Sequence, residues 1–157
     1  MAKSVTKKPH IMVVEARFYT EISDALFEGA ERALKKGGAT LERFQVPGAL
    51  EIPGAIRLAI EAQRQQKLKK PFDGYLALGC VIRGETTHYE SVCNESARGL
   101  TELGVQYAAC IGNGILTVEN DDQAWTRARV TEKDKGGGAA EAVLALIAIR
   151  RKLGLVA

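Results

Sequence analysis

The sequence is poor in the residues that build disulfides, metal sites and membrane spans. Among its 157 residues are three cysteines and two histidines, and no apolar run approaches the ~20 residues that cross a bilayer. Because Cys80, Cys93 and Cys110 are odd in number and form no CxxC pair, we expect reduced, buried thiols in a cytoplasmic protein. The net charge of +3 is too small, and the lysines and arginines too scattered, to indicate a nucleic-acid partner.

The start of the chain, MAKSVTKKP at 1–9, is basic and has no apolar core of the kind found in secretory signals. We expect residues 1–9 to form a flexible arm and residues 10–157 to form a single domain, because this length suits one hydrophobic core.

Apolar strand patterns alternate with amphipathic helical patterns along the chain. Strands are expected at 10–15, 40–46, 74–80 and 105–111, and helices at 21–36, 51–66, 87–103, 122–130 and 139–152. Residues 112–120 are expected to form a loop with a short extended piece at 115–118. This alternation predicts an α/β fold: a flavodoxin-like, three-layer αβα sandwich with a four-stranded parallel sheet in the order 2-1-3-4.

In such sheets ligands bind outside the carboxyl ends of the strands, so the segments that leave the strands form the candidate site. These segments are the residues around Phe18, PGALE at 47–51, CVIRGETTH at 80–88 and GNGILT at 112–117. Each is richer in glycine, polar or aromatic residues than a short connection requires, which favours a shared binding site.

The stretch at 76–96 combines a buried strand, a turn and an amphipathic helix. Thr86 or Thr87 can cap the helix, and the first N–H groups of a helix can face an anion. His88 lies in the first turn beside that anion site, where it is either an acid–base group or a solvated surface residue. A nearby cysteine could form a nucleophilic pair with it, but no third residue is marked to orient such a pair.

Four other residues have both a functional and a structural interpretation. Phe18 offers a flat face to an aromatic ring, or packs as a hydrophobic staple where its helix begins. Glu51 can hold ligand hydroxyl groups or stabilise its helix, and Arg127 can bind phosphate or be solvated. Asn113, between two glycines, is a polar contact or a turn residue. With His88, these residues suggest acid–base chemistry on a phosphorylated small molecule beside a planar ring.

Several long motifs match a known family in the correct order. They are VEARFY at 14–19, VPGALEIP at 46–53, LGCVIRGETTHYE at 78–90 and NGILTVEN at 113–120, followed by QAW before Arg127 and DKGG at 134–137. Over residues 10–153 the chain resembles the lumazine synthases, which catalyse the penultimate step of riboflavin biosynthesis. The resemblance implies condensation of 5-amino-6-(D-ribitylamino)uracil with 3,4-dihydroxy-2-butanone 4-phosphate to give 6,7-dimethyl-8-ribityllumazine, phosphate and water. It implies no metal and no bound cofactor.

The resemblance also implies roles for individual residues. His88 would donate and accept protons, and Phe18 would stack on the pyrimidine. Glu85 and Thr86 would line the phosphate site, with Arg127 reaching the phosphate from an adjacent subunit. The other implied contacts are Ala49, Leu50 and Glu51 with the ribityl chain, Cys80, Val81 and Ile82 with the uracil, Asn113 from the adjacent subunit, and Lys135 near the substrates.

Two positions depart from the family pattern. Many members have an aromatic residue where this chain has Asn113, and some have an acidic residue, which orients the histidine, where this chain has Gly138. Glu85 or Glu141 would have to take over that orienting role. A non-catalytic flavin- or lumazine-binding protein and a flavodoxin-like electron carrier are the alternatives to an enzyme. Neither needs the joint presence of His88 and Arg127.

Members of the family form rings of five subunits, and some rings assemble further into a shell of sixty. Shell-forming members resemble one another in a connection, GTKAGN, before the last helix. The matching stretch here is RVTEKD at 129–134, which has neither glycine and adds charge. We therefore expect a free homopentamer with its sites between adjacent subunits, and a face-to-face pair of pentamers as the nearest alternative.

Overall fold

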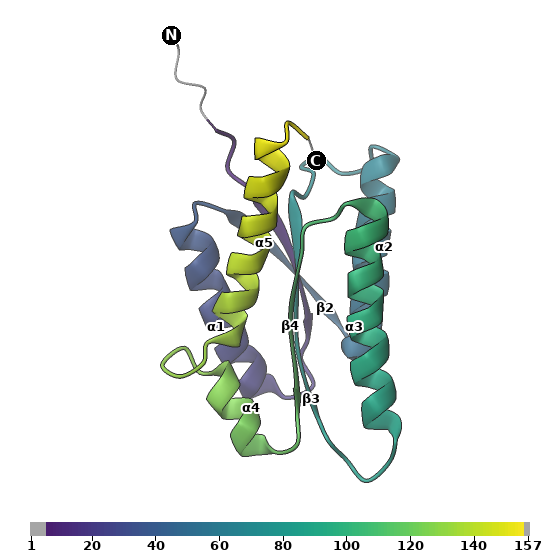
Figure 1. Ribbon diagram of the computed structural model, residues 1–157, viewed down its shortest axis with the longest axis vertical. Coiled ribbons are helices and arrows are strands. Elements are labelled where there is room, and N and C mark those ends of the chain that lie inside the picture. The colour runs from purple at the N-terminus through teal and green to yellow at the C-terminus, as the bar shows by residue number, and fades with distance from the viewer. Residues whose placement is uncertain (1–5, 156–157) are drawn as a thin grey trace.

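A computed structural model describes residues 6–155 as alternating strands and helices (Figure 1). The four parallel strands are β1 (His10–Ala16), β2 (Thr40–Val46), β3 (Gly74–Ile82) and β4 (Ile111–Val118). Their order in the sheet is β2-β1-β3-β4, so the predicted order 2-1-3-4 is confirmed.

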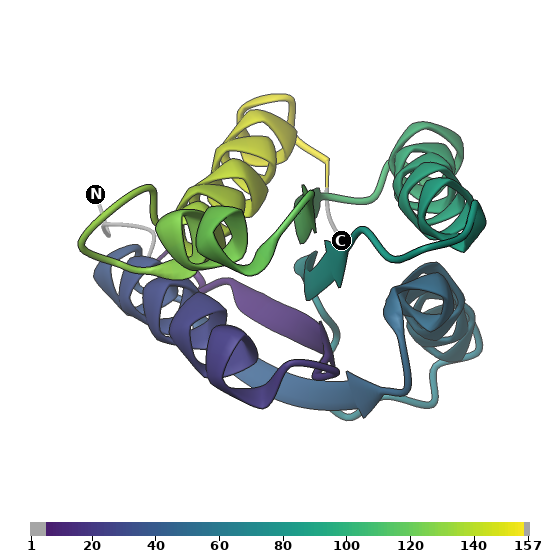
Figure 2. The same ribbon diagram turned by 90° about the horizontal axis from the view of Figure 1, so that it is seen from below.

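Helices cover both faces of the sheet (Figure 2). One face carries α1 (Thr20–Lys36), α4 (Asp121–Ala128) and α5 (Lys135–Lys152). The other carries α2 (Ile52–Arg64), which follows a short 3-10 turn at Ala49–Glu51, and α3 (His88–Tyr107). The predicted three-layer αβα sandwich is therefore confirmed.

The central strand β1 is buried along its whole length, because its two faces belong to two separate cores. Ile11 and Val13 pack into the core under α1 and α5, whereas Met12 and Val14 pack into the core under α2 and α3. A strand covered on both faces needs apolar residues without alternation, which explains the pattern of the sequence. Each fully buried aliphatic side chain contributes about 1.5–3 kcal/mol to folding.

The prediction of a strand at 105–111 is wrong. Helix α3 continues past Gly104 to Tyr107 and ends at Ala108, which adopts a left-handed conformation with φ of 51°. Strand β4 begins only at Ile111, so the stretch expected as a loop is the strand itself. Leu103 packs into the core and Val105 is exposed, which suits one more helical turn better than a buried strand.

In the sequence, Gly112 and Gly114 resemble the glycines of a loop. In the structure, close packing around β4 leaves no room for a side chain at either position. A Cβ atom at Gly112 would lie 2.3 Å from the Ala139 carbonyl oxygen of α5, and one at Gly114 would lie 2.7 Å from Leu78 Cδ2. Helix α5 begins at residue 135 rather than at the predicted residue 139. The glycines of its first turn are also helical residues that allow close packing, since a Cβ at Gly136 would lie 2.1 Å from the Leu26 carbonyl oxygen.

The expected flexible arm at 1–9 is described only in part, because residues 1–5 lie outside the described range. Residues 6–9 form no helix or strand. The Pro9 carbonyl accepts a 2.8 Å hydrogen bond from the Thr40 N–H, and the Lys7 carbonyl accepts one of 2.6 Å from Arg151. Within residues 6–155, no helix has the length and apolarity that a membrane span needs.

Candidate active site

A cavity of about 400 Å³ opens beside the carboxyl ends of β1, β2 and β3. These strand ends lie toward the bottom of Figure 1. We call this space the first cavity. It brings together eight of the predicted site residues from three separate connections: Phe18; Ala49, Leu50 and Glu51; Cys80, Val81, Ile82 and His88. Parallel strands deliver their carboxyl ends to one edge, which explains why residues so far apart in sequence meet here.

Phe18 presents its ring to this cavity and to solvent. Its side chain is 74% exposed, and its aromatic contact is an edge-on one with Tyr19, at 4.9 Å between ring centroids. Tyr19 is the N-cap of α1, so the staple interpretation would require Phe18 to pack on the polar Ser23. The exposed ring therefore fits a stacking surface for a ligand better than a packing contact.

The connection after β2 forms the opposite rim of the cavity. Gly48 is extended, and the 3-10 turn that follows buries Ala49 while Leu50 and Glu51 remain exposed. A Cβ atom at Gly48 would lie 3.2 Å from Glu51 Oε2, so the carboxylate folds back over the glycine. Pro53 lies in the first turn of α2, as the sequence predicted.

Strand β3 and the loop at 83–87 supply the floor of the cavity and its histidine. Cys80 is buried, Val81 and Ile82 are half-buried, and His88 is the first residue of α3, with an exposed side chain. Neither threonine caps this helix well. Thr87 at the N-cap makes no side-chain cap hydrogen bond, and Thr86 accepts one from the His88 N–H at a long 3.4 Å.

The poorly capped start of α3 leaves backbone N–H groups free to meet an anion. Glu85 and Thr86 lie in the exposed loop before this helix start and do not line the cavity itself. The resemblance implies that both residues line a phosphate site, and in the structure they precede the start of α3.

The cysteine–histidine alternative has little support in the environment of the thiols. Burial raises the pKa of Cys80 to about 12, and burial also raises the pKa of Cys93. A nucleophilic cysteine needs a thiolate, whereas these thiols stay protonated at neutral pH. All three cysteines are free.

The remaining predicted site residues line a separate cavity of about 490 Å³ on the α5 side of the sheet. This second cavity contains Asn113 from β4, Arg127 from α4 and Lys135 from α5, and it shares no lining residue with the first cavity. Within one chain, therefore, the structure does not bring these three residues to His88.

Arg127 is half-buried at this second cavity. Its Nη1 donates a 3.1 Å hydrogen bond to the Gln123 carbonyl, one turn back in α4, and it forms no ion pair with another residue in the range 6–155. Asn113 is not a turn residue, because it lies within β4, where its Oδ1 accepts a 3.0 Å hydrogen bond from the Ile115 N–H.

Sequence reasoning gave no role to several residues that line the two cavities. Tyr19, Gly48 and Val92 line the first, and Thr117 lines the second. Val92 follows His88 by four positions, so helical spacing could have placed both side chains on the cavity face of α3.

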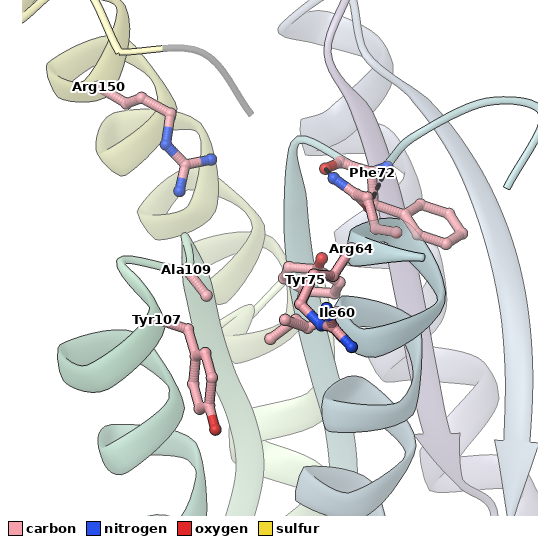
Figure 3. A pocket seen from close by; sticks show the side chains of 8 residues that line it. Ile60, Arg64, Phe72, Tyr75, Tyr107, Ala109 and Arg150 are labelled. Carbon is pink, nitrogen blue, oxygen red and sulfur yellow. Dashed lines mark hydrogen bonds between the residues drawn. The ribbon is translucent and has the colours of Figure 1, made fainter. Parts of the chain in front are cut away.

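A third cavity, of about 280 Å³, lies at the opposite end of the sheet (Figure 3). Its arginines already have protein partners: Arg64 pairs with Glu61, and Arg150 donates to the backbone carbonyls of Asp73 and Ala108. Burial raises the pKa of Tyr75 to about 12, so its hydroxyl stays protonated. This cavity therefore offers no acid–base group comparable to His88.

A doubly wound α/β sheet with a histidine and an exposed aromatic ring at its strand ends defines a small-molecule enzyme of the α/β class. Comparisons with known proteins identify the family. The sequence profile of 6,7-dimethyl-8-ribityllumazine synthase matches residues 8–151. The chain therefore belongs to the 6,7-dimethyl-8-ribityllumazine synthase family.

Relatives with high identity support this assignment. The 6,7-dimethyl-8-ribityllumazine synthase of Bartonella tribocorum is 55% identical, over 98% of both chains. That of Agrobacterium fabrum is 54% identical, over 94% of this chain and 98% of the relative. The 6,7-dimethyl-8-ribityllumazine synthase 1 of Rhizobium meliloti is 53% identical, over 94% of this chain and 95% of the relative. The prediction of a lumazine-forming enzyme of riboflavin biosynthesis is confirmed.

Proposed function

We propose that this chain condenses 5-amino-6-(D-ribitylamino)uracil with 3,4-dihydroxy-2-butanone 4-phosphate at a site shared by two adjacent subunits of a ring. The first cavity of one subunit would face the second cavity of its neighbour. The observation that carries this proposal is the division of the predicted residues between two cavities with no residue in common. One cavity holds the histidine and the aromatic ring, and the other holds the cations Arg127 and Lys135.

In this arrangement the first cavity binds the uracil. Phe18 stacks on the pyrimidine, and Val81 and Ile82 at the end of β3 contact its edge, with Cys80 beside them. Ala49, Leu50 and Glu51 hold the ribityl chain, for which the exposed carboxylate of Glu51 is a suitable hydroxyl acceptor.

The phosphate of the second substrate binds where the start of α3 meets the neighbour's cations. Backbone N–H groups at a helix start favour a dianion, and a planar guanidinium such as that of Arg127 binds it with two parallel hydrogen bonds. Glu85 and Thr86 border this position, while Lys135 and Asn113 approach from the adjacent subunit.

Each step of this condensation includes a proton transfer, so an acid–base group is the main catalytic requirement. The uracil amine attacks the ketone and loses one water to form an imine, phosphate is eliminated, and ring closure onto the remaining carbonyl expels a second water. His88 donates and accepts the protons of these steps, because histidine is the side chain that most often transfers protons in enzymes. Holding both substrates in one closed site adds the usual advantage of orientation.

The alternative, a non-catalytic binding protein on the same scaffold, would need neither His88 nor Arg127. The names of the relatives above, all of them synthases, favour the enzyme. A cytoplasmic location is part of the same proposal, and the three free cysteines support it.

Mixed rings test the shared site directly. At butanone phosphate concentrations well below the wild-type KM, His88→Ala and Arg127→Ala subunits are each expected to have little activity alone. Co-expressed in one ring, they create junctions in which the intact His88 of one subunit meets the intact Arg127 of the other. We therefore expect lumazine formation to return to a substantial fraction of the wild-type rate. If both residues served a site within a single chain, mixing would restore nothing, and the proposal would be wrong.

A further inference from the structure

The end of β1 carries a buried carboxylate that the proposed reaction does not use. Glu15 is 2% exposed. Its Oε1 accepts hydrogen bonds from Arg17 Nη1 at 2.9 Å and Arg43 Nη2 at 3.0 Å, and its Oε2 accepts one from Arg43 Nε at 2.8 Å. Arg43 in turn lies over the Phe27 ring, 3.5 Å from its centroid. A buried carboxylate needs a cationic partner, because an unpaired charge in the protein interior is costly.

Arg17 differs from Arg43 in having a second anionic partner. Its Nη1 binds Glu15, while its Nη2 donates to the carboxylate of Asp24, in the second turn of α1. One planar guanidinium thus joins the end of β1 to the body of α1. Three residues connect the two elements, and they are Arg17 itself, Phe18 and Tyr19.

The ring of Phe18 has little else to hold it in place. It is largely exposed, and the N-cap residue Tyr19 makes no side-chain cap hydrogen bond to the helix start. The backbone of the bend must therefore set the direction of the ring, and the Arg17 bridge is what spans that bend. Arg43 reaches the same carboxylate from β2 and contacts α1 through the ring of Phe27. Phe27 lies nearly one turn beyond Asp24, so the link of Arg43 to the helix lies farther from the bend than that of Arg17.

We infer that Arg17 is a positioning residue: by tying Glu15 to Asp24 it fixes the bend that presents Phe18 to the pyrimidine ring. This inference rests on the proposed function, which supplies the ligand of Phe18. It adds a residue that acts through the aromatic platform and does not itself touch a substrate. Lysine should replace it poorly, because a single ammonium group cannot reproduce a guanidinium that binds two carboxylates at once.

The matched variants are Arg17→Met and Arg43→Met, which each remove one cation from Glu15 and leave an aliphatic side chain. Both are expected to lower the melting temperature. Only Arg17→Met should weaken binding of the uracil substrate, by about tenfold, while the KM for the butanone phosphate stays unchanged. A displaced ring loses orientation, and small displacements in a site have effects of this order or larger. Equal weakening by Arg43→Met would overturn the inference, because the effect would then follow stability alone.

A double-mutant cycle with Phe18→Ala separates this inference from the proposed function. If Phe18→Ala leaves uracil binding unchanged, the proposed pyrimidine site is wrong. If Phe18→Ala weakens binding, the combined Arg17→Met and Phe18→Ala protein should bind no worse than Phe18→Ala alone. Additive effects would overturn the positioning role.

Hydrogen exchange supplies a readout that needs no substrate. The Ser23 N–H donates a 2.9 Å hydrogen bond to the Tyr19 carbonyl at the start of α1. Arg17→Met should speed exchange in a peptide covering 17–24, whereas Arg43→Met should leave that peptide unchanged relative to the rest of the protein. Unchanged exchange in Arg17→Met would show that the bend does not depend on the bridge and would overturn the inference.

Discussion

Cys80 and His88 line the same cavity, but the thiol is buried and the imidazole is exposed. Because burial raises the pKa of Cys80 to about 12, the thiol cannot act as a nucleophile near neutral pH. We expect Cys80→Ala to keep kcat within about twofold and to lower stability by about 1 kcal/mol, the typical effect of a small core substitution. Steady-state kinetics and chemical denaturation measure the two effects. A loss of turnover comparable to that of His88→Ala would return the cysteine to the mechanism.

His88 is expected to carry the proton transfers. His88→Ala should lower kcat by about 10²–10⁴-fold, the usual range for a general acid–base group. Substrate binding should change much less, because the pyrimidine and phosphate contacts remain. Steady-state kinetics with both substrates measures the two effects. A His88→Ala protein that keeps the wild-type kcat would contradict the assignment.

Arg127 and Arg129 lie two positions apart and offer a matched pair for testing the phosphate site. Arg127 lines the second cavity without an ion pair among the described residues, whereas Arg129 pairs with Glu132 at 3.0 Å and lies over the Trp125 ring. Arg127→Ala should weaken binding of the butanone phosphate and of inorganic phosphate by roughly 10- to 150-fold, the loss of about 1.5–3 kcal/mol for one charged hydrogen bond. Binding of the uracil should hardly change.

Titration calorimetry of the three ligands can separate this role from a structural one. Arg129→Ala serves as the control and should leave all three affinities intact. Equal weakening of uracil and phosphate binding by Arg127→Ala would mean that the arginine supports the structure of α4 instead.

The two central strands could be predicted from sequence because burial on both faces demands continuous apolar residues. The fourth strand could not. Gly112 and Gly114 look like loop residues in the sequence. In the structure Gly112 makes room for α5, and Gly114 makes room for Leu78 and Ala77 of β3, a tertiary constraint that local sequence does not record. The same kind of error placed the start of α5 four residues too late, at 139 instead of 135.

Some residues of the candidate site could likewise be predicted from the sequence, and some contacts could not. The residues of the first cavity follow strand ends, so the sheet topology alone brings them together. The partnership of Arg17 with Asp24 could not be predicted, because both are ordinary charged residues and only the bend after β1 makes them neighbours. The separation of Arg127 from His88 within one chain agrees with the resemblance, which implies that this arginine acts in the site of an adjacent subunit.

His10 predicts a pH dependence of stability. Burial of the ring, followed by the nearby charge of Lys70, lowers the pKa of His10 from 6.5. Its Nδ1 lies 2.7 Å from Thr40 Oγ1, and the ring stacks on Phe72 with 5.1 Å between centroids. Below pH 6.5 the unfolded chain binds a proton here that the folded chain resists, so the unfolded state gains stability.

We therefore expect the free energy of unfolding to fall as pH drops through 6.5 toward the lower pKa of the folded state. His10→Asn should reduce this slope, as measured by urea denaturation at a series of pH values. A wild-type slope of the opposite sign would show that the folded protein favours the charged form of His10.

The connection between α4 and α5 bears on assembly. Asp134 adopts a left-handed conformation with φ of 43°, and its Oδ1 accepts a 3.1 Å hydrogen bond from the Gly137 N–H at the start of α5. Aspartate tolerates this conformation better than most residues. The connection can therefore adopt the same left-handed backbone conformation as one that contains glycine. Its exposed charges are what favour a smaller assembly.

Those charges are Arg129, Glu132 and Lys133, all exposed in the described chain. Burying them between rings would cost desolvation that a mixed set of surface charges does not repay. We therefore expect a free pentamer of about 85 kDa, built from five chains of 17.0 kDa each, as the dominant species. Sedimentation velocity would distinguish it from a pair of pentamers at twice that mass. A particle near sixty copies would show that these charges find partners across the rings, and that the connection permits the larger shell.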